Sequence, residues 1–114
     1  MYEYNAKVVR VYDGDTIWVD IDLGFGIWMQ NQPVRFANID TPEVRGEEKA
    51  EGFIARDRVI QLLEEAGNEC VFRTSIEKAK YGRIIAEVFV KDKTSSINDI
   101  LLAECLAIAY MVND

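Results

Sequence analysis

The amino-acid sequence predicts a mostly β fold of the α+β class, in which five strands form a small barrel and two helices pack at its ends. Three observations support this prediction. Apolar and polar residues alternate at the strand period over much of the first 40 residues and again between about 70 and 90. Helical spacing follows residue 47, and a helix start signal follows residue 95. No linker or repeat interrupts the 114 residues, so we expect one domain spanning residues 1–114.

The N-terminal part predicts two strands joined by a tight turn. Residues 4–12 (YNAKVVRVY) are rich in β-branched and aromatic side chains, as strands are. Residues 13–15 (DGD) are a turn signal. Residues 16–22 then place Ile and Val on one face and Trp and Asp on the other, which is typical of a half-buried strand.

A long hairpin is expected next. Residues 23–26 (LGFG) predict its turn, the chain returns through residues 27–30, and a further strand follows over residues 32–39. Pro42 ends this strand, because the residue before a proline avoids helical geometry. The sequence therefore predicts a loop around residues 40–43.

The second half predicts a helix and two more strands. Apolar residues recur at helical spacing from about residue 47 to residue 66, and Gly67 with Asn68 is a stop signal. Residues 70–72 predict a short strand, and residues 84–90 alternate as another.

The C-terminal part predicts the second helix. Ser96 followed by Asp99 resembles a capping box for a helix through about residue 104. Residues 106–111 are apolar and expected to be extended. The chain ends at Asp114, so we expect the domain to be marginally stable or to self-associate through this apolar C-terminal region.

The absence of histidine excludes many kinds of site. Ser-His-Asp and Cys-His triads, a histidine base and histidine-ligated metals all require it. Cys70 and Cys105 lie far apart, so they form no zinc motif, and we interpret both as reduced core residues. A bound metal must then be a hard cation held by oxygens, such as calcium, magnesium or manganese. Proton transfer falls to a carboxylate, Tyr, Lys, Cys or water.

The net charge of −7 and the pI near 4.6 argue against binding nucleic acid through overall charge. A local basic site remains compatible with this, because net charge does not say where the charges lie. The sequence has neither a stretch apolar enough for a membrane span nor a signal peptide, so we expect a cytoplasmic protein with no membrane association.

Five polar residues form the most informative constellation. Asp15 and Asp40 stand at the ends of neighbouring predicted strands and are able to share one divalent cation. Arg35 and Arg83 would bind phosphate oxygens bidentately through their guanidinium groups. Glu43 is a carboxylate without an obvious partner and is a candidate general base.

Four segments carry a resemblance to the staphylococcal-nuclease-like (thermonuclease) family, over about residues 4–110. They are VYDGDTI at 11–17, VRFANIDTPE at 34–43, AKYGRIIA at 79–86 and INDILLAECLAIAY at 97–110. The resemblance implies an OB-fold. It also implies a calcium-dependent phosphodiesterase, an endonuclease that cleaves single-stranded DNA or RNA and leaves 3′-phosphates and 5′-hydroxyls.

The resemblance also implies roles for individual residues. Asp15 and Asp40 would ligate one Ca²⁺ through their carboxylates and Thr41 through its backbone carbonyl. Glu43 would be the general base, and Arg35 and Arg83 would bind the phosphate and stabilise the transition state.

Four further residues would act beside this set. Asp13 would lie close to the metal without binding it directly. Lys80 and Tyr81 would contact a neighbouring phosphate of the bound strand, and Tyr110 would face a base. Cys105 stands where the family often has glycine, which predicts a strained or reshaped end of the second helix.

Other interpretations of these residues stay open. A DGD sequence alone is more often only a turn, and lone arginines usually pair on the surface. Trp18, Trp28 and Phe25 favour hairpin packing over base stacking. The alternative to an enzyme is a non-catalytic OB-fold module that binds nucleic acid or a protein; a purely structural component would leave the carboxylates and arginines unexplained.

Overall fold

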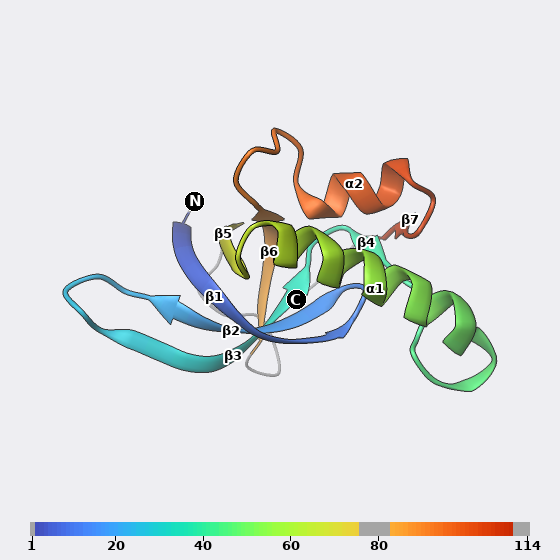
Figure 1. The fold of residues 1–114 in the computed structure, drawn as a ribbon, viewed down its shortest axis with the longest axis horizontal. Coiled ribbons are helices and arrows are strands. Elements are labelled where there is room, and N and C mark those ends of the chain that lie inside the picture. Colours follow the sequence, from blue (N-terminus) through green and yellow to red (C-terminus); the bar gives the residue numbers. More distant parts are fainter. Residues whose placement is uncertain (1, 76–82, 111–114) are drawn as a thin grey trace.

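A computed structural model describes residues 2–75 and 83–110, and Figure 1 shows the arrangement of their strands and helices. Their buried hydrophobic residues form one core cluster. Five strands form a closed barrel in the order β1-β2-β3-β6-β5. Their bounds are β1 Tyr2–Asp13, β2 Thr16–Asp22, β3 Trp28–Phe36, β5 Glu69–Thr74 and β6 Ile84–Phe89. All neighbours pair antiparallel except β3 and β6, which are parallel. The predicted five-stranded barrel is confirmed, and it is consistent with an OB-fold.

The alternation in the sequence directs the core side chains inward. Ile17, Val19 and Ile21 of β2 are at most 2% exposed, as are Val34 and Phe36 of β3. The residues between them point to the outer face of the barrel, because successive strand side chains lie on opposite faces. This outer face of β2 and β3 supplies part of the candidate site.

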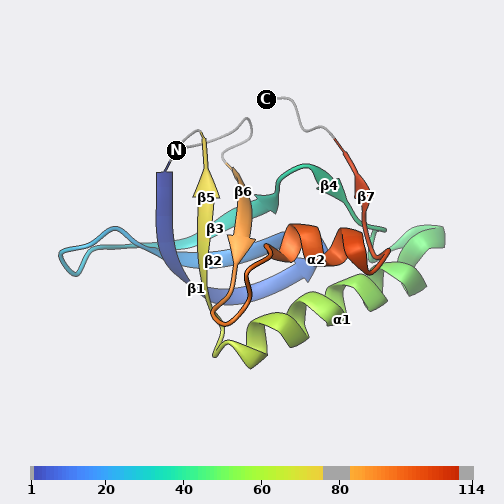
Figure 2. The ribbon, with the colours of Figure 1, turned by 90° about the horizontal axis from the view of Figure 1, so that it is seen from above.

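Two helices cover the barrel (Figures 1 and 2). A short 3₁₀ turn, η1 (Gly46–Glu48), leads into α1 (Lys49–Glu65), which buries Ala55, Val59, Leu62 and Leu63. The second helix, α2 (Ile97–Ala103), lies beside α1 and β6. Arg58 of α1 donates two 2.8 Å hydrogen bonds to Glu104 at the end of α2, so the two helices are joined there. No helix in the described part of the chain is long and apolar enough to cross a membrane.

The strand predicted over residues 32–39 is wrong at its end. β3 stops at Phe36, and the chain turns at Asn38, whose φ is +64°. Asparagine tolerates this left-handed conformation better than most residues. A separate two-residue strand follows, β4 (Ile39–Asp40), which pairs with β7 (Ile108–Ala109). The turn therefore moves Asp40 out of the barrel sheet and toward the C-terminal segment.

The buried amide of Asn98 holds this turn. Its Oδ1 accepts a hydrogen bond from the Val88 N–H, and its Nδ2 donates to the carbonyls of Ala37 and Ala86. Asn98 is 3% exposed, so these bonds satisfy the polar atoms of its buried amide group. One side chain of α2 thus connects β6 to the segment that leads into β4.

The end of α2 has a left-handed residue at Cys105, in agreement with the reshaped helix end expected there. Its φ is +61°, while the Cys105 N–H bonds to Leu102 O and the Leu106 N–H bonds to Leu101 O. This is the Schellman arrangement, in which glycine is favoured at the left-handed position. The cysteine is free and exposed, so its interpretation as a core residue is wrong, whereas Cys70 is buried.

Replacing Cys105 with glycine is expected to stabilise the protein by about 1 kcal/mol, because glycine adopts a positive φ without steric cost. Urea unfolding of the wild type and Cys105→Gly would measure the difference. The matched control is Cys105→Ala, which keeps the Cβ and should bring no comparable gain. Equal stability of the glycine and alanine variants would show that the left-handed backbone is not strained.

Candidate active site

The first three strands bring Asp13 and Arg35 to one row on the outer face of the barrel. Asp13 pairs with Thr16 across β1 and β2, and Thr16 pairs with Arg35 across β2 and β3. Their neighbours Ile17 and Val34 point into the core, so Thr16 and Arg35 take the opposite face. The barrel register thus places groups that are 22 residues apart in the sequence side by side.

Asp15 lies at the centre of the site and is 6% exposed. Its Oδ2 is 3.3 Å from Arg35 Nη1 and accepts a 3.1 Å hydrogen bond from the Thr41 N–H. Its backbone N–H donates to Asp13 Oδ1, which closes the turn between β1 and β2. The carboxylate therefore joins the β1–β2 turn, β3 and the segment after β4.

Gly14 lets this turn lie against α1. A Cβ at Gly14 would stand 2.8 Å from the Cβ of Ala55 and 2.9 Å from two side-chain carbons of Thr41. Real Cβ atoms do not approach other atoms so closely, so the middle residue of DGD has to be glycine for packing. Its φ is not positive, and the reason is therefore close approach and not turn geometry.

Asp40 lies on the other side of Arg35, with 3.5 Å between its Oδ1 and Arg35 Nη2. The same guanidinium donates from Nη1 to the Phe36 carbonyl. One buried arginine thus faces two carboxylates, and Asp13 is a third close to them. Three carboxylates around one guanidinium leave an excess of negative charge, which is the main electrostatic property of this cluster.

The carboxyl groups show this crowding in their pKa values. Burial, a hydrogen bond with Asp15 and the Asp15 charge raise the pKa of Asp13 to about 7. Burial and then the charge of Asp15 raise the pKa of Asp40, although Arg35 opposes the shift. Arg35 alone does not neutralise the cluster, so the site favours additional positive charge.

Glu43 follows Asp40 on the loop and extends into solvent. Its side chain is 65% exposed, and its Oε2 lies 3.7 Å from Arg45 Nε. The backbone beneath it is tightly packed: a Cβ on Gly52 of α1 would overlap the carbonyl oxygen of Glu43 and would stand 2.9 Å from Val44 N. Gly52 therefore lets α1 support the loop that carries Glu43.

Replacing Gly52 with alanine is expected to displace Glu43 and to reduce any activity that uses it by about 10²-fold, because backbone atoms cannot rotate away from the new methyl group. Steady-state kinetics would measure the loss. Gly67→Ala is the control, since Gly67 (φ +70°) ends α1 far along the chain and has no atom within 4 Å of an added Cβ. That control should lose stability but keep any such activity. A Gly52→Ala protein with unchanged activity would rule out this support role.

Arg83 enters the same region immediately before β6. Its Nε is buried and has no hydrogen-bond acceptor within residues 2–75 and 83–110. A cavity of about 610 Å³ contains this arginine and Arg35. The carboxylates that line it are Asp13, Asp15, Asp40 and Glu43, and Thr41 lines it as well. Two arginines and an acidic cluster thus share one open cavity.

The donor set around Asp15 and Asp40 consists only of oxygens. Among the described residues, no three Asp, Glu, His or Cys side chains meet closely enough to hold a metal ion by themselves. Two carboxylates and a carbonyl leave room for water in the coordination shell, which suits a hard divalent cation. Thr41 is buried, and its hydroxyl has no partner in the part of the chain that the structure describes.

One predicted binding residue, Tyr110, lies apart from this set. Tyr110 donates its backbone N–H to Asn38 O, but its ring is 52% exposed and does not line the cavity. Lys80 and Tyr81 lie outside the described residues.

Comparison with known proteins identifies the family. The model of the family described as staphylococcal nuclease homologue matches residues 33–114. This chain belongs to the staphylococcal nuclease family. Its similarity to a micrococcal nuclease of Shigella flexneri is 32% identity over 115 residues, which cover 95% of this chain and 59% of that protein. The chain thus spans about three fifths of this relative, and the resemblance found in the sequence is confirmed.

Part of the wall of the cavity that contains Arg35 and Arg83 was not predicted from the sequence. Arg10, Tyr12, Trp18 and Pro33 line it together with the predicted residues. The available signal was the strand alternation, which puts Thr16 and Trp18 on the same face of β2. Which residues of β1 and β3 lie beside Trp18 depends on the register of the strand pairs, and the sequence of a single strand does not show it.

Proposed function

We propose that this chain is a calcium-dependent phosphodiesterase that cleaves single-stranded DNA or RNA within the strand. The observation that carries the proposal is the cavity in which Arg35 and Arg83 accompany four carboxylates. Guanidinium groups bind phosphate oxygens in pairs, and carboxylates bind hard cations or accept protons. Membership of a nuclease family supports the same chemistry.

In this proposal Asp15 and Asp40 would hold one Ca²⁺ through carboxylate oxygens and Thr41 through its carbonyl. The ion, when bound, would supply Lewis acidity toward a phosphate oxygen and orient water. Asp13, whose Oδ1 accepts the Asp15 N–H, would fix the position of Asp15. Arg35 already contacts both proposed ligands, so its guanidinium would lie next to a bound phosphate.

The protein residues would then divide the reaction between them. Glu43, which is exposed at the cavity, would take a proton from the water whose oxygen attacks phosphorus. Arg35 and Arg83 would stabilise the charge that grows on the phosphate oxygens, and the Arg83 Nε–H, which has no acceptor among the described residues, would provide one donor for it. The phosphorus–O5′ bond breaks, and the products are a 3′-phosphate and, after protonation, a 5′-hydroxyl. Lys80, Tyr81 and Tyr110 would bind the flanking strand.

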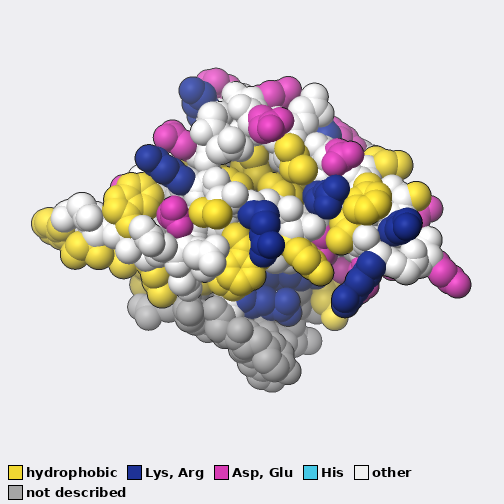
Figure 3. Space-filling model, turned by 60° about the horizontal axis from the view of Figure 1, so that its bottom comes forward, with side chains coloured by type: hydrophobic (Ala, Val, Ile, Leu, Met, Phe, Trp, Pro, Cys, Tyr) yellow, Lys and Arg dark blue, Asp and Glu magenta, His cyan; other side chains and the backbone are white. Residues whose placement is uncertain are grey.

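The charge distribution favours single strands. The chain carries −7 overall, so a rigid duplex would press many phosphates against an acidic body. Figure 3 shows a face on which basic side chains gather across the middle, among hydrophobic ones, while acidic side chains lie mainly toward its edges. A flexible strand can bring one phosphate to the arginines without such repulsion.

The experiment that tests this function is digestion of a 5′-labelled single-stranded oligonucleotide by the purified protein in Ca²⁺. We expect internal cleavage and fragments whose mobility changes after a phosphatase removes the 3′-phosphate. The same sequence annealed as a duplex should be cut much more slowly. Intact oligonucleotide, or equal cutting of the duplex, would contradict the proposal.

Calcium binding is expected to be measurable without any substrate. Titration calorimetry should detect about one Ca²⁺ per chain for the wild type, and Asp40→Asn should weaken that binding strongly, since it removes one of two charged ligands. Asp22→Asn is the control, because its carboxylate caps the hairpin at Gly24 N far from the site. Equal affinity of the wild type and Asp40→Asn would exclude Asp40 as a ligand.

A further inference from the structure

Next to the row that holds Arg35 lies a second row on the same outer face. Arg10 pairs with Trp18 across β1 and β2, and Trp18 pairs with Pro33 across β2 and β3. Thr16 and Trp18 are separated by one residue, so the two rows are about 7 Å apart along the strand. The second row therefore continues the surface of the candidate active site.

Trp18 belongs to the wall of the cavity and not to the core. Its ring is partly exposed and lines the cavity that holds Arg35 and Arg83. The guanidinium carbon of Arg10 lies 5.4 Å from the ring centroid, which is within the range of a cation–π contact. Trp18 thus combines an aromatic surface with a positive charge held beside it, at a site where a nucleic-acid strand would enter.

We propose that Trp18 and Arg10 form a binding subsite for the nucleotide next to the scissile phosphate. This inference rests on the proposed nuclease function and names one part of its substrate site. The indole ring stacks on the base, and Arg10 pairs with the adjoining phosphate. Because every base has an aromatic face, the subsite strengthens binding without selecting a sequence.

The charges along β2 limit this subsite to one nucleotide. Beyond Trp18 the next two outward residues of β2 are Asp20 and Asp22. Asp20 accepts the Asn31 N–H and Asp22 accepts the Gly24 N–H, so both carboxylates are fixed on the hairpin. They repel the next phosphates of a strand that followed the hairpin, and the bound strand must leave the surface there.

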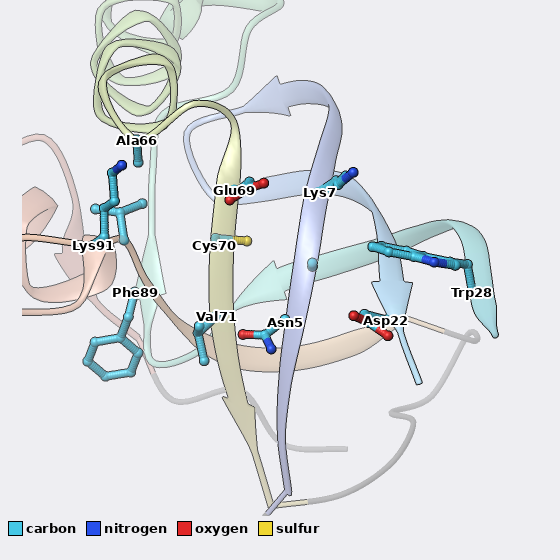
Figure 4. Close-up of a pocket in the computed structure, with 12 residues that line it drawn as sticks. Asn5, Lys7, Asp22, Trp28, Ala66, Glu69, Cys70, Val71, Phe89 and Lys91 are labelled. Carbon is cyan, nitrogen blue, oxygen red and sulfur yellow. The ribbon is translucent and has the colours of Figure 1, made fainter. Parts of the chain in front are cut away.

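The same hairpin supplies a matched control. Trp28 is 40% exposed, and the ammonium nitrogen of Lys7 lies 5.3 Å from its ring centroid, so this pair has similar chemistry. Figure 4 shows Trp28 and Lys7 at a different cavity, of about 480 Å³, which also contains Asp22 and Glu69. None of the proposed catalytic or metal-binding residues lines that cavity. A general effect of removing an exposed tryptophan would therefore appear in both variants.

The test compares Trp18→Leu with Trp28→Leu on a short single-stranded oligonucleotide in Ca²⁺. We expect Trp18→Leu to raise KM about tenfold with little change in kcat, and Trp28→Leu to leave KM unchanged. A base-free phosphodiester oligomer of equal length serves as a competitive inhibitor. Its Ki should change little in Trp18→Leu but should rise in Arg10→Ala, because that oligomer offers phosphates and no bases.

Two further variants separate stacking from folding. Trp18→Phe keeps an aromatic ring and should remain within about threefold of the wild-type KM. The exposed Arg10 side chain does not pack in the core, so Arg10→Ala tests the subsite even if Trp18→Leu folds poorly. If the wild type cleaves the oligonucleotide but KM rises equally in Trp18→Leu and Trp28→Leu, or rises in neither, the subsite is overturned and the proposed function is not. A wild-type protein that neither binds nor cleaves the oligonucleotide would instead overturn the proposed function and the subsite with it.

Discussion

Arg35→Ala is expected to lower the rate of cleavage of single-stranded DNA by about 10³-fold or more. The guanidinium lies between the two proposed calcium ligands, and Arg35 is 8% exposed. Because the position is buried, a water molecule in the alanine variant would be a poor substitute for the guanidinium as a hydrogen-bond donor to the phosphate. Loss of one such preorganised donor typically costs 10²–10³ in kcat, and here the position of Asp15 and Asp40 depends on the same group. Steady-state kinetics at saturating Ca²⁺ would measure the loss.

The controls for Arg35 address folding and charge. Removing it leaves the buried carboxylate of Asp15 without its charged partner, so the melting temperature of the variant must be measured alongside its rate. Arg35→Lys keeps the charge but lacks the planar pair of donors, and it should recover little activity. Arg83→Ala is the second test, since no ion pair to a described residue depends on it. Folded Arg35→Ala and Arg83→Ala proteins with wild-type rates would exclude the phosphate-binding role.

Glu43→Gln is expected to reduce kcat by about 10²–10⁴-fold and to leave KM nearly unchanged, as for the loss of a positioned general base. The side chain is 65% exposed and has no role in the core, so the variant should fold as the wild type does. Glu47→Gln, a few residues further on in the 3₁₀ turn, is the matched control. A Glu43→Gln protein with the wild-type kcat would show that Glu43 is not the general base.

The sequence predicted the barrel well because its signals are local. Alternation marked the inward residues of β2, and Ser96 accepts the Asp99 N–H as the capping signal indicated. The break after Phe36 could not be predicted in this way. It depends on Asn98, which is 61 residues from Ala37 in the chain and reaches it only in the folded protein.

The charged residues of the site could be predicted from the sequence, but the glycines that let the surrounding segments pack closely could not. Asp15, Arg35 and Asp40 stand out because a core has no use for them, and the structure brings them together. Gly14 and Gly52 do not stand out, since the contacts that require glycine are made with α1 and with Glu43 across the fold. The Arg10–Trp18–Pro33 row was missed for a similar reason, because it exists only in the register of three strands.

The most direct measurement is the rate at which the purified protein degrades denatured DNA in Ca²⁺ and in excess chelator. An Arg35→Ala preparation purified in parallel would reveal contaminating nuclease. The account predicts rapid degradation by the wild type in Ca²⁺, almost none in chelator, and almost none by the variant in either. Undiminished degradation in chelator, or equal degradation by both preparations, would contradict it.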